Sequence, residues 1–152
     1  MLEIIIDADG CPVKEEVYRV AQRYRLHVTV VANSRIRIPA LGSVDLVVVT
    51  GQFDAADDWI AGHVTVNDII VTGDIPLAAR CLDKGALVLG PRGDTFTQDS
   101  IGAALANRAL LAHLRELGTI TGGPAPFANR DRSRFLQRLD ETVRAVRRRS
   151  QA

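Results

Sequence analysis

Five short apolar segments alternate along the chain with longer segments whose apolar residues recur at helical spacing. Residues 44–50, VDLVVVT, are continuously apolar after Asp45, as in a parallel strand that is buried on both faces. This alternation predicts an α/β fold, a three-layer sandwich with a mainly parallel central sheet of about five strands and helices on both faces. The predicted strands lie at residues 2–6, 27–32, 44–50, 68–73 and 86–90.

Between and after these strands, apolar residues recur every three or four positions, which is the spacing of one face of an α-helix. Pro12 suits a first helical turn, and Asp54, Asp74 and Thr97 stand where helix N-caps are expected. We expect one domain over residues 1–152 with a substantial core. Helices are predicted at about residues 13–24, 54–63, 75–85, 98–118 and 130–149, and loops at 33–43, 91–97 and 119–131.

No export or membrane signal is visible in the sequence. Glu3, Asp7 and Asp9 stand where a signal peptide needs a basic start and a long apolar run, and the apolar segments are too short to span a membrane. Cys11 and Cys81 lack a metal-ligand spacing, so we expect reduced thiols and a cytoplasmic protein. Cys11 is interpreted as a packing or spacing residue rather than a nucleophile.

Charge is unevenly distributed along the chain. Residues 129–152 contain eight arginines and three acidic residues, a balance of +5, whereas residues 1–128 have a balance of −4. An acidic body with a basic C-terminal helix, at about residues 130–149, suits a metal site beside a polyanion. A solvated terminal helix explains the arginines equally well.

Acidic residues follow the ends of three predicted strands. Two follow the first strand directly, three lie a few residues beyond the third, and one lies just beyond the fourth. The carboxyl ends of parallel strands share one edge of a sheet, where ligands of such folds bind, so these side chains are expected to meet there. The set is Asp7, Asp9, Asp54, Asp57, Asp58 and Asp74.

The individual roles follow from position. Asp54 is interpreted as a helix cap rather than a ligand. Asp57 and Asp58 are adjacent, so a helix points them about 100° apart and one of the two faces the site; the sequence leaves open which. The candidate catalytic residues are Asp7, Asp9, Asp58 and Asp74, and the candidate metal ligands are these four together with Asp57.

Several carboxylates at one edge repel one another by several kcal/mol in a partly buried site, so a cation is the expected compensator. Carboxylates without neighbouring histidine or cysteine ligands favour Mg²⁺ or Mn²⁺ over Zn²⁺, and such ions commonly act on phosphates. Polar and basic residues in or near the loops of that edge are candidate contacts to a phosphate-bearing substrate. They are Lys14, Asn33, Arg35, Arg37, Thr72, Arg92 and Arg130.

Several motifs together resemble the YaiI/YqxD family of small bacterial proteins: DADGCPVKEEVYRVA, VTGDIPLAARCLDKGA, PRGDTFT and ITGGPAPFANRDRSRF. The resemblance runs from Ile4 to about Leu139. Gly10 stands where alanine is expected and Gly73 where alanine is common, and neither difference removes a candidate ligand.

That family is similar to PIN-like and NYN-like domains, and PIN-type nucleases cut RNA with Mg²⁺ or Mn²⁺ at the acidic edge of a parallel sheet. The resemblance therefore implies a PIN-like, metal-dependent ribonuclease with RNA as its partner. Asp7 matches the first-strand aspartate, and Thr72 with Asp74 matches a T-x-D motif after a later strand. The middle acid corresponds to Asp57 or Asp58.

Two other interpretations remain open. IIIDADGCPV also resembles the first motif of haloacid-dehalogenase-like phosphatases, in which Asp7 would be the nucleophile and Asp9 the acid/base, with Thr50 in the second motif. Ala78 stands where that family needs a later acid, and Lys84 closes a helix. The third interpretation is a non-catalytic RNA- or protein-binding module that keeps an acidic pocket.

Overall fold

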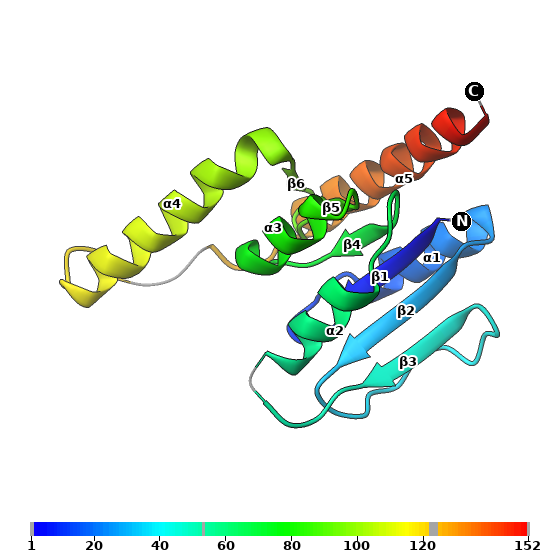
Figure 1. The fold of residues 1–152 in the computed structure, drawn as a ribbon, viewed down its shortest axis with the longest axis horizontal. Helices are drawn as coiled ribbons and strands as arrows, with labels where there is room; N and C mark the ends of the chain where they lie inside the picture. Colours follow the sequence, from blue (N-terminus) through cyan, green and yellow to red (C-terminus); the bar gives the residue numbers. More distant parts are fainter. Residues whose placement is uncertain (1, 53, 122–124, 152) are drawn as a thin grey trace.

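The computed structural model describes residues 2–52, 54–121 and 125–151, and a six-stranded sheet forms the centre of the described molecule (Figure 1). The strand order is β3-β2-β1-β4-β5-β6, and neighbouring strands are parallel except for the antiparallel pair β5 and β6. The bounds are β1 Glu3–Asp7, β2 His27–Ala32, β3 Val44–Val48, β4 Ile69–Val71, β5 Leu87–Leu89 and β6 Thr95–Phe96.

Helices cover both faces of this sheet, as the sequence predicts, and the three-layer α/β arrangement is confirmed. Two of them begin with a side-chain cap. Thr97 forms a capping box with Ser100 at the start of α4, and Asp74 caps α3. The bounds are α1 Lys14–Tyr24, α2 Ala55–His63, α3 Ile75–Asp83, α4 Gln98–Glu116 and α5 Asn129–Gln151.

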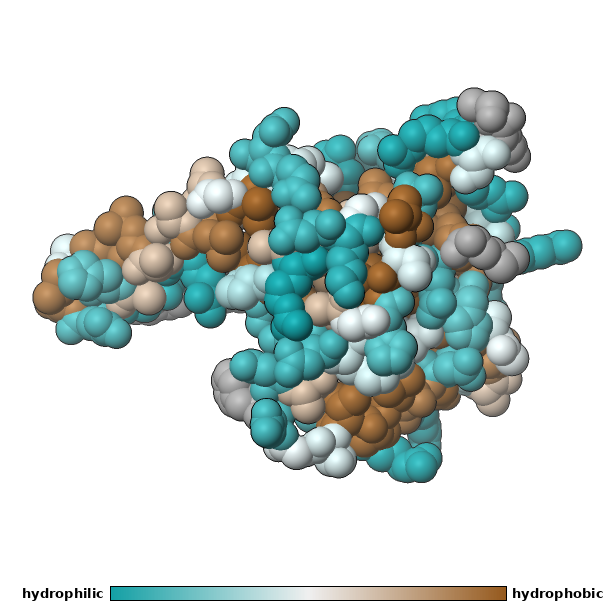
Figure 2. All heavy atoms as spheres, viewed as in Figure 1, coloured by the Kyte–Doolittle hydropathy of each residue, from teal (hydrophilic) through white to brown (hydrophobic). Residues whose placement is uncertain are grey.

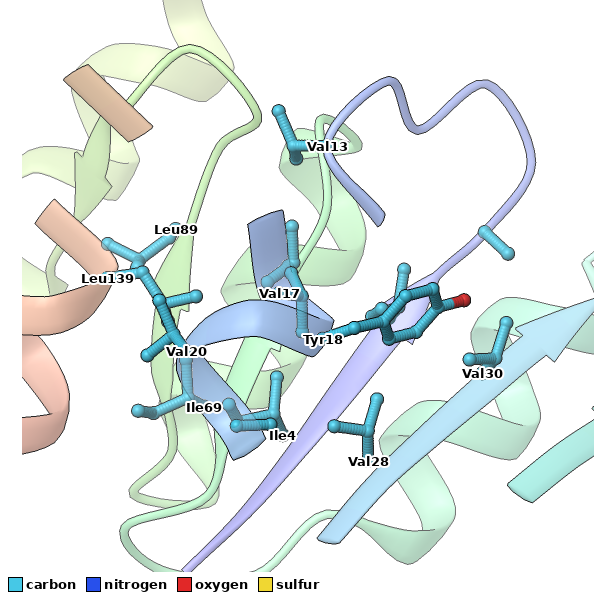
Figure 3. Packing of buried hydrophobic residues seen from close by; sticks show 14 of the residues in the cluster. Ile4, Val13, Val17, Tyr18, Val20, Val28, Val30, Ile69, Leu89 and Leu139 are labelled. Atoms are coloured by element: carbon cyan, nitrogen blue, oxygen red, sulfur yellow. The ribbon is translucent and has the colours of Figure 1, made fainter. Parts of the chain in front are cut away.

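The core is divided by the sheet into two clusters, because successive side chains of a strand point to opposite faces. Ile4 and Ile6 of β1 pack on one face against α1 and α5. Figure 3 shows this face, with Leu139 of α5 beside the α1 side chains. Ile5 points to the other face and packs with Ile60 of α2 and with α3.

The sheet has six strands rather than the expected five or so, and the difference is β6. Residues 91–97 are predicted as a loop, but the chain turns at Gly93, with φ at 90°, and residues 95–96 pair with β5. A two-residue strand carries no periodic pattern that the sequence could reveal. The predicted helix at about 130–149 is confirmed as α5, with slightly wider bounds.

Helix α4 departs from the layered body. It packs against α3 near its beginning and then projects away from the sheet, as the yellow arm in Figure 1 shows. Ile101 is the one residue of α4 that is buried. No helix in the described part of the chain combines the length and apolar character that crossing a membrane requires.

The strand order determines where a ligand can enter. The chain moves from β1 to β2 on one side and later returns to β4 on the other side of β1. The carboxyl ends of β1 and β4 therefore flank a topological switch point, where loops diverge in opposite directions and leave a crevice.

Candidate functional site

A cleft of about 330 Å³ opens at this switch point. Its lining includes carboxylates from the ends of β1 and β4 and from the beginning of α2, together with Cys11, Asn33 and Pro91. We call it the acidic cleft, and its carboxylates belong to Asp7, Asp9, Asp54, Asp57 and Asp74.

The hydroxyl of Thr72 connects the two strand ends. It donates a hydrogen bond to Oδ2 of Asp7 at 2.7 Å and accepts one from the backbone N–H of Asp74 at 3.0 Å. Thr72 is only 2% exposed, so it lies beneath the cleft surface and fixes the Asp7 carboxylate. Thr72 also belongs to the lining of the cleft, and these two hydrogen bonds give it a positioning role there.

Asp74 combines the two roles that its sequence position suggested. Its Oδ1 accepts a hydrogen bond from the backbone N–H of Leu77 at 3.0 Å and so caps α3. The same carboxylate group lines the acidic cleft, and its second oxygen, Oδ2, is not used by the cap. Capping thus orients Asp74 without removing it from the site.

Asp9 lies on an exposed turn at the mouth of the cleft. Gly10 has φ at 75°, a left-handed conformation that glycine adopts without strain, and the chain then turns back toward α1. Oδ2 of Asp9 accepts a hydrogen bond from the backbone N–H of Asn33 at 3.1 Å, which ties the β1 turn to the loop after β2. Cys11 lines the cleft as well, and burial raises the pKa of its thiol.

The first turn of α2 resolves the choice between the two adjacent aspartates. Asp57 lines the acidic cleft. Asp58 does not; it is exposed and forms an ion pair with Arg80 at 2.9 Å. The structure therefore places Asp57 in the position for which the sequence-based catalytic set named Asp58.

Asp54 is a cleft residue that the sequence analysis dismissed as a cap. It stands at the N-cap position of α2, but its side chain makes no capping hydrogen bond and lines the cleft instead. The available signal was its place in the segment between β3 and α2, beyond the carboxyl end of β3, at the same edge of the sheet as Asp7.

The crowded carboxylates affect one another's protonation. Burial raises the pKa of Asp7, the hydrogen bond from Thr72 acts in the opposite direction, and the charges of Asp74 and Asp9 raise the pKa further. Burial, followed by the charges of Asp74, Asp7 and Asp54, raises the pKa of Asp57 to about 6. The carboxylates of the cleft thus form an unfavourable concentration of negative charge at neutral pH.

This electrostatic strain predicts a pH-dependent gain in stability for Asp57→Asn. The Asp57 carboxyl, with a pKa of about 6 when folded and 3.8 as its ordinary value, stabilises the fold most below pH 3.8, and that contribution is lost as pH rises through 6. In metal-free buffer, the variant should melt at a higher temperature than the wild type at pH 8. The difference should disappear near pH 4 in thermal denaturation followed by circular dichroism.

The matched control is Asp58→Asn, which removes an adjacent carboxylate that is paired with Arg80 outside the cleft. It should show no comparable gain at pH 8. A wild-type melting temperature that equals or exceeds that of Asp57→Asn at pH 8 would contradict strain among the cleft carboxylates.

Some of the basic residues predicted to contact a phosphate-bearing substrate make hydrogen bonds within the protein, and others are exposed. Lys14 donates its Nζ to the backbone carbonyl of Cys11 at 2.9 Å, just behind the cleft lining. Arg35 and Arg37 are exposed on the loop that follows the carboxyl end of β2. Arg130 is exposed in the first turn of α5.

Arg92 is occupied by a structural role. Its guanidinium forms an ion pair with Asp131 at 3.2 Å, donates to the carbonyl of Ala125 and lies 5.8 Å from the ring centroid of Phe127. These contacts hold the segment before α5 against the turn after β5. Within the predicted loop 119–131, residues 122–124 lie outside the described residues.

Arg132 is a residue of this region that the sequence analysis missed. Its Nη1 donates to the carbonyl of Pro12 and to Oε1 of Glu16, both at 2.8 Å, and its guanidinium lies 5.1 Å from the Phe127 ring centroid. It thereby joins the start of α5 to the start of α1, beside the carboxyl edge of the sheet.

The carboxylates of the acidic cleft can be compared with the ligands that a metal ion requires. Among the described residues, no three histidine, cysteine, aspartate or glutamate side chains are already gathered as a metal-binding group. Mg²⁺ commonly binds through one or two carboxylates, retains several waters and takes further oxygens from a phosphate. Carboxylate oxygens in a strained, partly buried cleft fit that mode, with Asp7, Asp57 and Asp74 as the residues that would hold the ion.

Comparison with known proteins places these residues in a family context. The family model described as "Uncharacterized BCR, YaiI/YqxD family" matches residues 5–145. A UPF0178 protein of Rhodospirillum centenum is 61% identical over 152 residues and covers 97% of this chain and 99% of its own. One from Rhodospirillum rubrum is 54% identical, with 97% and 99% covered, and one from Brucella ovis is 55% identical, with 92% and 88% covered. No solved structure matches the chain.

Proposed function

The chain belongs to the YaiI/YqxD family, and we propose that it is a divalent-metal-dependent phosphodiesterase that cleaves RNA at the acidic cleft. One observation carries the proposal. Five carboxylates from three separate segments meet in one cleft at the switch point of the sheet, where substrates of such folds bind. The PIN-like resemblance of Asp7, Thr72 and Asp74 supports the same reaction.

The carboxylates supply the metal site. Asp7 is held by the Thr72 hydroxyl, and Asp74 is held by its cap to α3, so both carboxylates are positioned before any ligand arrives. Asp57 adds a third carboxylate from the first turn of α2, and the exposed Asp9 and Asp54 line the same cleft. When bound, Mg²⁺ or Mn²⁺ supplies Lewis-acid activation of water and stabilises negative charge on the phosphate.

The surrounding residues orient the nucleic acid. Arg35, Arg37 and Arg130 are exposed near the carboxyl edge and would contact backbone phosphates. Asn33 lines the cleft and offers an amide to a phosphate or ribose oxygen. The raised pKa of Cys11 keeps its thiol protonated at neutral pH, so we assign it no nucleophilic role.

Asp7 and Asp9 both line the cleft, as the phosphatase interpretation also expects, but its other motifs have no counterpart there. Thr50 is exposed and does not line the cleft. Lys84 lies at the C-cap of α3, the far end of that helix from Asp74. Among the described residues that line the cleft there is no lysine.

The proposal predicts metal-dependent cleavage by the purified protein. Labelled single-stranded RNA, single-stranded DNA and duplex RNA would be incubated with Mn²⁺ or Mg²⁺ and resolved on denaturing gels. We expect RNA cleavage that EDTA abolishes and that weakens as salt rises, because phosphate contacts release counterions. Mn²⁺ alone should raise the melting temperature, since it binds the native state; at 100 times Kd the stabilisation is about 2.7 kcal/mol.

Other outcomes of this experiment point elsewhere. Tight RNA binding that persists in EDTA without turnover would favour a non-catalytic binding module. No cleavage of any substrate together with no metal-induced stabilisation would contradict the proposal.

A further inference from the structure

The projecting arm of α4 presents apolar side chains that no other element in the described part of the chain buries. Six residues on its projecting part fall within an arc of about 160° at 100° per residue, and none of them is buried. Leu110 is 55% exposed, and Leu117, which follows the helix, is 64% exposed. Figure 2 shows apolar side chains gathered along this arm. We call this surface the arm face; it consists of Ala103, Ala104, Ala106, Leu110, Leu111 and Leu114.

The total surface of the chain exceeds that of a compact monomer. A folded monomer of 16.5 kDa is expected to expose about 7,600 Å². This chain exposes 8971 Å². The excess of about 1,400 Å² belongs to the whole molecule, and the projecting α4 contributes to it; a stable protein interface takes about 800 Å² from each partner.

A helix in this position also needs a partner for its own stability. Isolated helices of about 12–15 residues are marginal in water, and most helical stability in proteins comes from packing an apolar face. α4 has 19 residues and only Ile101 is buried. A surface that covers the arm face would supply the missing packing.

The order of small and large residues along the arm face favours pairing of α4 with the α4 helix of a second copy of the chain, in antiparallel orientation. The alanines lie in its first half and the leucines in its second half. Antiparallel pairing about a twofold axis near Asn107 places Ala104 opposite the partner's Leu111 and Ala106 opposite the partner's Leu110. Large side chains then meet small ones, and both helices use the same surface, as a twofold dimer requires.

We propose that the protein forms a homodimer through antiparallel pairing of α4, with the arm face of each chain as the interface. The acidic clefts lie at the sheets and not on the arms, so each protomer keeps its own cleft. The proposal is independent of the function assigned to the cleft.

Sedimentation equilibrium of the full chain tests the interface. From about 1 to 100 µM, a range that detects micromolar dimers, the wild type should show twice the 16.5 kDa chain mass. Leu110→Glu places two charges, one from each chain, in the apolar interface of the dimer. It should weaken dimerisation at least about 100-fold. The control Ala109→Glu introduces the same charge on the other side of α4 and should remain dimeric.

A cysteine crosslink tests the orientation. Asn107→Cys, beside the proposed twofold axis, should form an interchain disulfide on mild oxidation, whereas Ala109→Cys should not. A wild type that stays monomeric at 100 µM, or a dimer that Leu110→Glu leaves intact, would overturn the interface. A dimer in which Asn107→Cys fails to crosslink would overturn the antiparallel arrangement.

Discussion

Replacing Asp7 with asparagine should lower the metal-dependent cleavage rate at least about 100-fold, as expected for loss of a charge that acts on the transition state. The substitution keeps the size of the side chain, and the amide oxygen can still accept the hydrogen bond from Thr72. It removes one negative charge from the acidic cleft, where Asp57 and Asp74 would have to hold the ion without it. Initial rates at saturating Mn²⁺ provide the measurement.

We expect the Asp7→Asn variant to fold normally. A lower cleavage rate can then be distinguished from a loss of folded protein. Burial and neighbouring charges raise the pKa of Asp7, so the neutral amide relieves repulsion, and the metal-free melting temperature at pH 7 should not fall. Asp58→Asn is the matched control, because Asp58 is paired with Arg80 outside the cleft, and it should retain wild-type activity. Equal rates for Asp7→Asn and the wild type would remove Asp7 from the catalytic site.

Replacing Phe135 with alanine should cost about 3–5 kcal/mol of the free energy of unfolding, as is typical of a large buried aromatic side chain. Phe135 has no exposed surface and belongs to the cluster that attaches α5 to the sheet and to α1. Proteins of this kind have a total stability of about 5–15 kcal/mol, so the variant should be close to unfolding. Urea denaturation followed by circular dichroism at 222 nm, a standard helix signal, measures the loss.

The control for Phe135 lies two residues earlier on the same helix. Ser133 is exposed, and Ser133→Ala should change the stability by no more than about 0.5 kcal/mol. If Phe135→Ala cost less than about 1 kcal/mol, α5 would not be an integral part of the core.

Strand alternation and the rule for parallel sheets were sufficient to place Asp7 and Asp74 at one edge, because each directly follows a strand with a clear apolar pattern. The choice between Asp57 and Asp58 depended on the phase with which α2 begins. That phase is set by where α2 begins, with the Asp54 carbonyl accepting the first helical hydrogen bond from the Asp58 N–H, rather than by a local pattern.

Tertiary pairing explains the other differences. Arg92 was predicted as a phosphate contact, but its partner Asp131 lies 39 positions further along the chain and is brought to it by α5. The position of Arg92 in a predicted loop gave no indication of that partner. Strand β6 was missed because its pairing with β5 depends on the turn at Gly93 and not on its own two residues.

The position of α5 in the chain has a consequence for biosynthesis. All six strands precede it, so the sheet can form while the face that receives Phe135, Leu139 and Val143 still lacks its cover. At about 5–20 residues per second, the ribosome needs on the order of seconds to add the 23 residues of α5. During that interval α1 alone covers this face, and the nascent chain presents a partly uncovered layer of isoleucine and valine side chains, which is the kind of surface that promotes aggregation of truncated translation products.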